Sequence, residues 1–314
     1  MDVVALGELL IDFVCLSTDG DGYPTMAAHP GGAPANFLAA LTKYGAKTAL
    51  LGKVGTDAFG KMLTDTLAKA GIETRGIVAD ENVFTTLAFV TFDDQGDRKF
   101  SFARKPGADT CLRFEELDLS LIDQAKVFHF GTLSLTDEPV KTATEQAVHY
   151  AKERGKWITF DPNLRKPLWK SLDDARAAML WGLHQADFVK ISDEEVEFLW
   201  GCDEKEAGKK LLTEFGVKLA LITMGPKGAY LVNETASAYA ASPKVNPVDT
   251  TGAGDICGGS AVSQILRIGK PMETLNEEEL SQIVRFASTA ASLSTEKPGG
   301  IPAIPEYDTV MGRM

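Results

Sequence analysis

The most informative stretch of the chain is a glycine-rich turn that leads into a helical pattern, Asp249-Thr250-Thr251-Gly252-Ala253-Gly254-Asp255. Gly252 and Gly254 leave the backbone bare there, and the first amides of a helix attract anions together with its dipole. Asp255 would repel such an anion. Its presence makes sense if it takes a proton from a hydroxyl that attacks a phosphoryl group while the amides stabilise the moving charge. An ordinary turn with an acid at a helix start explains the spacing equally well, so both interpretations stay open.

Two nucleotide-binding motifs are matched only in part. Residues 55–61 fit the first seven positions of a Walker A loop, but Met62 stands where a hydroxyl would bind Mg²⁺. Residues 252–254 could open a dinucleotide fingerprint, but Cys257 replaces the third glycine and the motif lies far from a first βαβ unit. The sequence therefore argues against a P-loop and against NAD binding.

Outward from this turn, short apolar runs alternate with helical patterns. The expected strands are residues 3–6, 48–53, 127–130, 157–160, 188–191, 219–223 and 229–232. The expected helices are residues 33–44, 60–70, 138–154, 194–200, 204–215, 256–268 and 277–295. This alternation predicts βαβ units and an α/β fold with a mostly parallel sheet covered by helices on both faces.

Two segments interrupt the alternation. Residues 13–30 have no helical period, and residues 85–92 and 98–104 are predicted strands joined by the turn Asp93-Asp94-Gln95-Gly96-Asp97. We therefore expect a small β lid, built from residues 13–30 and 85–104, that closes over a site on the main sheet. The main catalytic domain then comprises residues 1–12, 31–84 and 105–314.

Composition excludes several classes of protein. The 44% hydrophobic fraction is enough for a sizeable core, and 32 basic against 44 acidic residues give a net charge of −12. A charge of this sign argues against nucleic acid or an anionic membrane as a partner. The apolar N-terminal run lacks a basic start and is too short to span a bilayer, so we expect a cytoplasmic protein. The four cysteines form no CxxC pair, which argues against a disulfide framework and a zinc ribbon.

A second glycine cluster, in the N-terminal half, enters a predicted helix as Gly31-Gly32-Ala33-Pro34-Ala35-Asn36. Small residues let a ligand approach the backbone, and Asn36 adds an amide. Asp12 follows the first strand, where α/β proteins place ligand groups, and a carboxylate there suits a diol. Turn or capping chemistry would explain each of these residues on its own.

Together the two clusters resemble the signatures of the PfkB, or ribokinase-like, family of sugar kinases. Residues 249–255 match one signature, and the other is matched by Gly31-Gly32-x-x-x-Asn36, Gly45 and Gly52-x-x-Gly55-x-Asp57-x-x-Gly60. The resemblance covers essentially the whole chain and implies a ribokinase-like three-layer sandwich with a small β lid. It also implies ATP-dependent phosphoryl transfer to a sugar hydroxyl, with Asp255 as the base and the amides of Gly252, Ala253 and Gly254 as the anion hole.

Three further segments resemble the fructokinases of this family: Phe100-x-Phe102-x-Arg104-x-Pro106-x-Ala108-Asp109, Phe128-His129-x-Gly131 and Asp161-Pro162-Asn163-Leu164-Arg165-x-Pro167-Leu168-Trp169. The resemblance implies that D-fructose is converted to fructose 6-phosphate. The sugar-binding residues it implies are Asp12, Gly31, Gly32, Asn36, Arg104 and Arg165. A structural role is the alternative for Arg165, and His129 is interpreted as a packed core residue.

The main alternative on the same scaffold is a 2-keto-3-deoxygluconate kinase, in which Arg104 and Arg165 would pair with a carboxylate. That subgroup favours tyrosines in the lid strand, where this chain has Phe100 and Phe102. Ribose or a nucleoside is a weaker alternative acceptor. The intact Asp255 argues against a non-catalytic sensor on this fold.

The nucleotide side is implied by the same resemblance. Residues 223–229 match the family's turn near the ATP ribose and phosphates, which implies roles for Thr223, Gly225 and Gly228, and residues 287–294 and 299–302 match the adenine side. The family's N-x-x-E motif appears as Ser192-Asp193-Glu194-Glu195, which implies that Glu195 acts on Mg²⁺ through water. Asp249 and Thr251 are the candidate positions for a monovalent cation such as K⁺.

Lid-to-lid pairing makes a homodimer an expectation.

Overall fold

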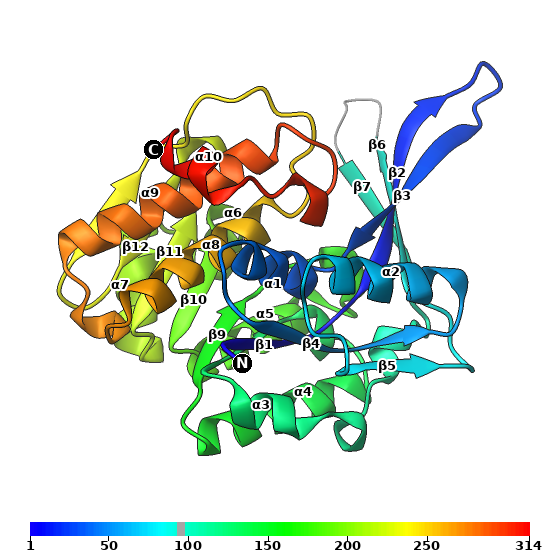
Figure 1. Cartoon of the computed structure of the whole chain (residues 1–314), viewed down its shortest axis with the longest axis horizontal. Coiled ribbons are helices and arrows are strands. Elements are labelled where there is room, and N and C mark those ends of the chain that lie inside the picture. Colours follow the sequence, from blue (N-terminus) through cyan, green and yellow to red (C-terminus); the bar gives the residue numbers. More distant parts are fainter. Residues whose placement is uncertain (93–97) are drawn as a thin grey trace.

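The structure, a computed structural model, describes residues 1–92 and 98–314. A nine-stranded sheet in the order β13-β12-β11-β10-β9-β8-β1-β4-β5 forms the body, and a separate sheet in the order β3-β2-β6-β7 projects from it (Figure 1). The predicted α/β fold with a mostly parallel sheet and a small β lid is confirmed. The predicted hairpin turn at residues 93–97 lies outside the described residues.

The strands of the main sheet are parallel except for β12 and β13, which add antiparallel strands at one edge. Their bounds are β1 Val3–Leu6, β4 Thr48–Gly55, β5 Ile77–Asp80, β8 Val127–Gly131, β9 Trp157–Asp161, β10 Phe188–Ser192, β11 Leu219–Thr223, β12 Ala229–Val232 and β13 Ser237–Ala240. Most are near-continuous apolar runs because helices bury both faces of a parallel sheet. The sequence analysis did not predict β5 and β13, both short strands near the sheet edges.

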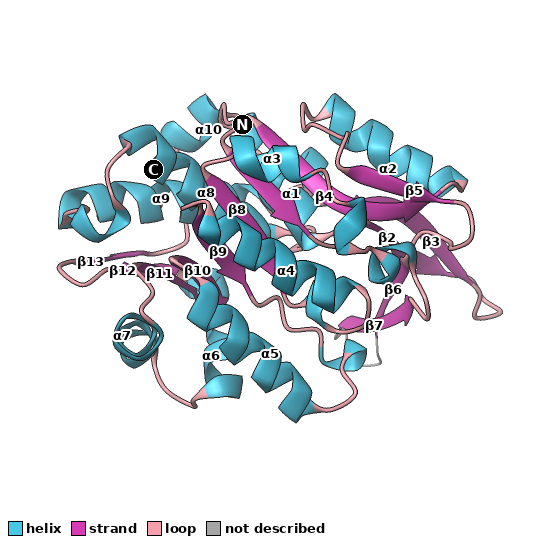
Figure 2. Cartoon of the chain, turned by 90° about the horizontal axis from the view of Figure 1, so that it is seen from below, coloured by secondary structure: helices cyan, strands magenta, loops and turns pink. Residues whose placement is uncertain are grey.

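Helices cover both faces of this sheet (Figure 2). On one face, a single hydrophobic core joins the sheet to α1 Ala33–Lys43, α2 Ala58–Lys69, α8 Ala253–Ile268, α9 Glu277–Ser294 and α10 Tyr307–Met311. On the other face, a second core joins it to α3 Leu119–Gln124, α4 Val140–Glu153, α5 Leu172–Gln185, α6 Asp193–Leu199 and α7 Glu204–Phe215. The sequence pattern missed α5 because its apolar residues are not confined to one side of the helix. None of the helices in the described ranges has the length and hydropathy needed to cross a membrane.

The lid consists of β2 Leu10–Thr18, β3 Pro24–Gly31, β6 Leu87–Phe92 and β7 Arg98–Ala103. Strand β2 pairs antiparallel with β3 and parallel with β6, and β6 pairs antiparallel with β7. Pairing starts at Leu10 opposite Gly31. Asp12 therefore lies on the first lid strand, close to the point where the lid leaves the main sheet.

The carboxyl ends of the central strands converge on one edge of the sheet. Glu8 follows β1, Asp161 ends β9, Ser192 ends β10 and Thr223 ends β11. Ligand sites of open α/β sheets lie at this edge. The lid and the start of α8 meet there as well, as the shared lining of one cavity shows.

Candidate active site

The first turn of α8 carries Asp255. Gly252 is the N-cap residue with a left-handed φ of 76°, and the helix begins at Ala253, three residues before the predicted start. Within the described residues no side chain caps this helix. Its first turn therefore presents backbone amides and the positive end of the helix dipole, as an anion hole requires.

Two amide side chains hold the Asp255 carboxylate. Asn36 Nδ2 donates to Oδ2 at 2.9 Å, and Asn163 Nδ2 donates to Oδ1 at 3.2 Å. Asp255 is only 6% exposed. Burial raises its pKa, although the amide of Asn36 and the charges of Lys190 and Arg165 oppose the shift. A carboxylate with a raised pKa is a stronger base, and the two amides fix its orientation.

Two glycines make room for Asn36 beside this carboxylate. A Cβ atom on Gly300 would lie 2.2 Å from Asn36 Oδ1, and one on Gly252 would lie 2.9 Å from Asn36 Nδ2. Side chains at either position would displace the amide. The contact therefore depends on three segments that are distant in the sequence: α1, the turn before α8 and the C-terminal loop.

Asp255 opens into a cavity of about 190 Å³ between the body and the lid. Of the predicted sugar-side residues, the structure brings together Asp12, Gly32, Asn36, Arg165 and Asp255. The apolar part of the wall is formed by Leu10, Val90, Phe102 and Leu133. Gly31 contributes space, because a Cβ atom there would lie 2.1 Å from Asp12 Oδ2. The size and the mixed lining fit one small polyol.

Arg104, a predicted sugar-binding residue, has all three of its guanidinium nitrogens hydrogen-bonded to protein groups. Its Nε donates to Asp109 Oδ2 at 2.8 Å, Nη1 to Thr136 Oγ1 at 2.7 Å and Nη2 to the carbonyl of Leu133 at 2.8 Å. Arg104 does not appear among the described residues that line the cavity, and its side chain is buried in an ion pair with Asp109. The physical reason is Asp109, five residues on, which takes the guanidinium as an ion pair.

The sequence analysis missed Glu8 as a lining residue. Its side chain is 3% exposed, and Ala33 N, the first amide of α1, donates to Glu8 Oε1 at 2.7 Å. Burial raises the pKa of Glu8 to about 7, even though this hydrogen bond favours the charged form. An acid directly after an apolar strand was the visible signal.

A second cavity, of about 430 Å³, lies on the other side of the α8 turn. It brings the predicted Thr223, Gly225 and Gly228 together with Ala253 and Gly254. The described lining also includes Ser288, Ala291 and Ser292 of α9 and several residues between Ser242 and Pro247, a loop that the sequence analysis did not single out. Thr250 and Gly254 line both cavities, so the two spaces meet at the predicted anion hole.

The predicted cation-associated residues are engaged by the protein itself. Glu195 Oε1 accepts from Leu164 N at 2.8 Å and Oε2 from Ser192 N at 2.9 Å. Asp249 accepts from the amide and hydroxyl of Thr251 at 2.9 and 2.7 Å and from Gly299 N at 2.8 Å. In the described residues no three acidic, histidine or cysteine side chains gather as a metal site would require.

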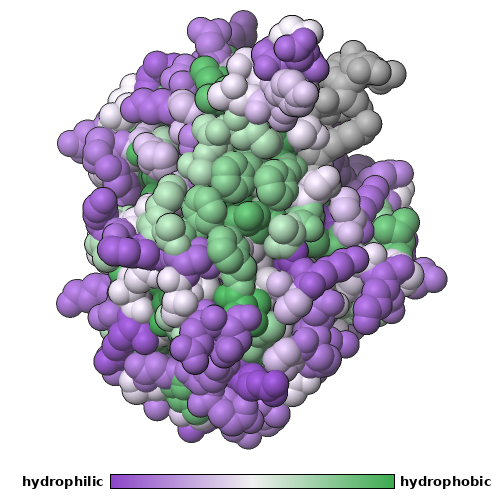
Figure 3. All heavy atoms as spheres, turned by 90° about the vertical axis from the view of Figure 1, so that its right-hand side faces the viewer, coloured by the Kyte–Doolittle hydropathy of each residue, from purple (hydrophilic) through white to green (hydrophobic). Residues whose placement is uncertain are grey.

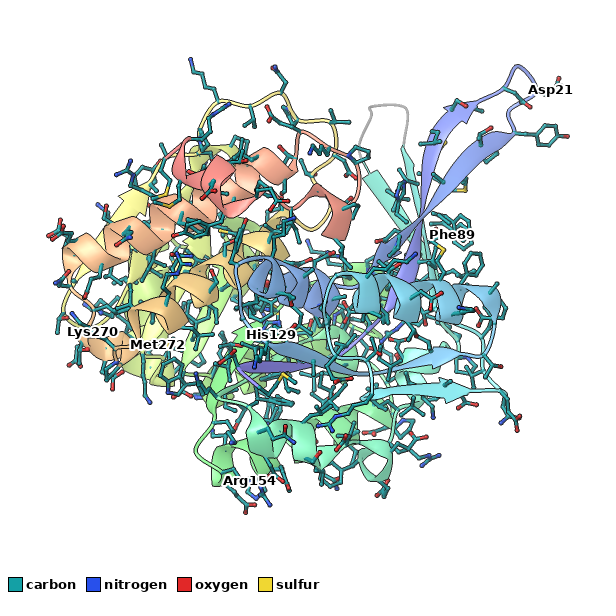
Figure 4. All side chains as sticks on the ribbon, viewed as in Figure 1. Asp21, Phe89, His129, Arg154, Lys270 and Met272 are labelled. Atoms are coloured by element: carbon teal, nitrogen blue, oxygen red, sulfur yellow. The ribbon has the colours of Figure 1, made fainter. Side chains whose placement is uncertain are left out.

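His129 lies in the interior beneath α1 (Figure 4). Its ring stacks on Phe37 with centroids 3.8 Å apart, and Nδ1 is 3.0 Å from Thr159 Oγ1. Burial lowers the pKa of His129 to about 3, so the ring is neutral. It is a packed core histidine, as the sequence analysis interpreted it.

A family model described as pfkB family carbohydrate kinase matches residues 1–306. The probable fructokinase-3 of Arabidopsis thaliana is 41% identical over 308 residues, which are 96% of this chain and 88% of that protein. The crystal structure of a fructokinase from Xylella fastidiosa with bound ATP has a TM-score of 0.87 at 28% identity and covers 99% and 97% of the two chains. A Vibrio cholerae fructokinase with fructose, ADP and calcium has a TM-score of 0.87 at 29% identity, covering 100% and 99%.

Proposed function

This chain belongs to the pfkB family of carbohydrate kinases, and from that membership we propose that it is a fructokinase, transferring the γ-phosphoryl group of ATP to D-fructose to give fructose 6-phosphate. One observation carries the proposal furthest. A small polar cavity and a larger, more apolar one meet at Thr250 and Gly254, directly beside Asp255. This is the arrangement that transfer between a sugar and a nucleotide needs, because catalysis of this kind rests on positioning and electrostatics.

In the proposed reaction, Asp12 and Asn36 hold the sugar, and Asp255 takes the proton from its attacking hydroxyl. The hydroxyl oxygen forms a bond to the γ-phosphorus, the bond to the β-γ bridging oxygen breaks, and ADP leaves. The amides of Gly252, Ala253 and Gly254 stabilise the charge on the transferring group. Thr223, Gly225 and Gly228 bind the nucleotide.

The divalent ion would be held chiefly by phosphate oxygens and water, as is usual for Mg²⁺ beside nucleotides. Glu195 fits a water-mediated role, because backbone amides already occupy both of its oxygens. Mg²⁺ would neutralise phosphate charge during transfer. We place a monovalent cation such as K⁺ near Asp249 and Thr251, where backbone carbonyls would complete its ligands.

A 2-keto-3-deoxygluconate kinase is the second candidate. Its carboxylate clamp would need Arg104 and Arg165 together, and only Arg165 of this pair is among the described residues that line the cavity. The engagement of Arg104 by Asp109 favours a neutral acceptor.

An ADP-release assay with Mg-ATP tests the proposal over fructose, ribose, glucose, 2-keto-3-deoxygluconate and adenosine. We expect kcat/KM for fructose to exceed that for the sugar acid by at least about tenfold, or about 1.4 kcal/mol of transition-state binding. A preference for the sugar acid would replace the fructokinase assignment and leave the kinase assignment standing.

We further propose a homodimer formed through the lids. Phe13 stacks on Phe89 at 5.4 Å and meets Phe59 edge-on, and Leu16 and Tyr23 on the lid are 64% and 71% exposed. Figure 3 shows apolar side chains gathered on the side of the molecule from which the lid projects. Patches of this kind mark protein contacts. Light scattering should give a dimer mass that Leu16→Glu reduces to the monomer mass.

A cytoplasmic location stays a prediction.

A further inference from the structure

A buried ion pair lies beneath the first turn of α8, and the reaction outlined above does not use it. Lys190 Nζ lies 3.1 Å from both Asp161 Oδ1 and Asp161 Oδ2, and both side chains are at most 6% exposed. The two residues lie on the neighbouring parallel strands β9 and β10. Lys190 is the single charged residue of β10, where it interrupts an apolar run. A charge inside such a strand is costly unless it is paired, as this one is with Asp161.

The lysine lies directly against the anion hole. A Cβ atom on Gly254 would be 2.9 Å from Lys190 Nζ, and one on Gly258 would be 3.7 Å from Lys190 Cβ. Gly254 and Gly258 are one helical turn apart, so the lysine side chain runs beneath the first two turns of α8. Gly254 lines both cavities, whereas Lys190 is not among the described residues that line either of them.

The charges around Asp255 come from four elements. Asp161 on β9, Glu195 on α6 and Asp255 itself on α8 supply carboxyl groups, while Lys190 on β10 and Arg165 after β9 are positive. Burial raises the pKa of Asp161 to about 7, although the charge of Lys190 opposes the shift. Burial alone would lower the pKa of Lys190, but the three carboxylates outweigh it and hold that pKa above its usual value. Lys190 therefore stays charged throughout the pH range of an assay. His129 and Cys257, which also lie near the lysine, stay neutral, because burial lowers the pKa of the histidine and raises that of the thiol.

We propose that Lys190, held by Asp161, is a positioning residue that keeps Asp255 in its carboxylate form and places a fixed positive charge behind the anion hole. The ammonium acts through space and through the α8 backbone, without touching a substrate. Such a charge counts for more inside a protein than in water, because the surrounding dielectric screens it less. It offsets the repulsion between Asp255 and an incoming phosphate. The catalytic consequence rests on the proposed function, whereas the effect on Asp255 does not.

Three variants separate this role from a structural one. Lys190→Met removes the positive charge, Asp161→Asn removes its negative partner, and Lys53→Met is the matched control. Lys53 is likewise buried at 4% exposure and paired with Asp80 and Glu116, but within the described residues it lines neither cavity. A double variant, Lys190→Met with Asp161→Asn, leaves no unpaired buried charge if either single variant fails to fold.

The primary measurement is a carbon-13 titration of the aspartate carboxyl groups, with the Asp255 signal assigned from an Asp255→Asn sample. We expect Lys190→Met to raise the pKa of Asp255 and Asp161→Asn to lower it, each by on the order of one pH unit. Lys53→Met should leave it unchanged. This measurement needs no substrate, so it stands whether or not fructose is the acceptor. An Asp255 titration that moves by less than a few tenths of a unit in both variants, or in the same direction in both, overturns the proposal.

The kinetic measurement uses the sugar that the panel assay selects. Lys190→Met should lower kcat by about tenfold or more, because it removes the positive charge behind the anion hole, with the KM for the sugar nearly constant. The acid limb of the kcat–pH profile of this variant should move to higher pH, because an Asp255 carboxyl group with a raised pKa loses its proton at a higher pH. The double variant should recover thermal stability without recovering kcat. Full activity in the folded double variant would show that the Lys190–Asp161 pair has only a structural role.

Discussion

Two helices of this protein begin at a glycine, and their first turns are used in opposite ways. The N-caps are Gly32 of α1 and Gly252 of α8, with φ values of 118° and 76°. At α1 the first amide donates to the buried carboxylate of Glu8, so the protein fills this anion site itself. At α8 no side chain of the described residues caps the first turn, and the turn faces two cavities. The start of α1 also borders the smaller cavity through Gly32 and Ala33, but its first amide is already taken by Glu8.

The buried ion pairs behind the two turns differ in the same way. The charges of Arg104 and Asp109 act on the carboxyl group of Glu8. Arg104, which is paired with Asp109, also connects the end of lid strand β7 to the loop at Leu133 and Thr136 by hydrogen bonds. Lys190 and Asp161 lie beneath α8 and attach to no part of the lid that the structure describes. The first pair is therefore expected to serve folding and lid attachment, and the second to serve the chemistry at Asp255.

The largest effect is expected at the open helix start. Asp255→Asn removes the proton acceptor and keeps the size of the side chain and the surrounding amides. Base catalysis contributes about 10²–10⁴ in rate, so kcat should fall by at least that order while the Kd for ATP stays nearly constant. Steady-state kinetics and calorimetry with ATP measure the two quantities. A variant with more than about a tenth of the wild-type kcat would show that Asp255 is not the base.

The difference between the helix starts also marks what sequence could predict. The alternation of strands and helices, the lid segments and the two glycine turns were visible because each is a local pattern. The start of α8 at Ala253 was not predicted, because the glycines there are typical of a turn. The contacts of Asn163, of Lys190 and of Arg104 with Asp109 were not predicted, because they join distant segments or bury a charge that usually lies outside. The lone Lys190 in an apolar strand was the one signal that could have been used.

Near the start of α1, whose first amide donates to Glu8, breaking the Arg104–Asp109 ion pair should lower the stability of the fold more than it lowers kcat. Arg104→Met leaves Asp109 buried without its counter-charge, so the free energy of unfolding should fall by about 3–5 kcal/mol. Urea denaturation measures it. Arg75→Met, which breaks the exposed pair with Asp118, serves as the control and should cost less than about 1 kcal/mol. A loss that small for Arg104→Met would argue against the anchoring role.

Glu8 itself should make stability depend on pH. Its pKa of about 7 in the folded protein exceeds the ordinary value of 4.5, so the native state binds the proton more tightly than the unfolded chain. Stability should therefore fall by on the order of 3 kcal/mol as pH rises from below 4.5 through 7. Glu8→Gln keeps an oxygen for the Ala33 amide and titrates no proton, so its unfolding free energy should vary less over this interval. Parallel pH dependences of the two proteins, measured by thermal unfolding, would contradict the burial of an ionisable Glu8.

The smallest effect is expected at Asp12, whose proposed role is to bind the sugar without taking part in the chemistry. Asp12→Ala removes a charge-assisted hydrogen bond worth roughly 1.5–3 kcal/mol, so the KM for fructose should rise about tenfold to a hundredfold. The KM for ATP and kcat should change little, because the nucleotide cavity does not include Asp12 among its described lining. Gly31→Ala provides an independent test, since its Cβ atom would lie 2.1 Å from Asp12 Oδ2 and would push the carboxylate aside without altering its charge. Both variants should therefore show the same selective loss of sugar affinity. Equal damage to the KM values of both substrates would assign Asp12 to the folding of the lid instead, and the sugar side would then depend on the α1 start and Arg165 alone.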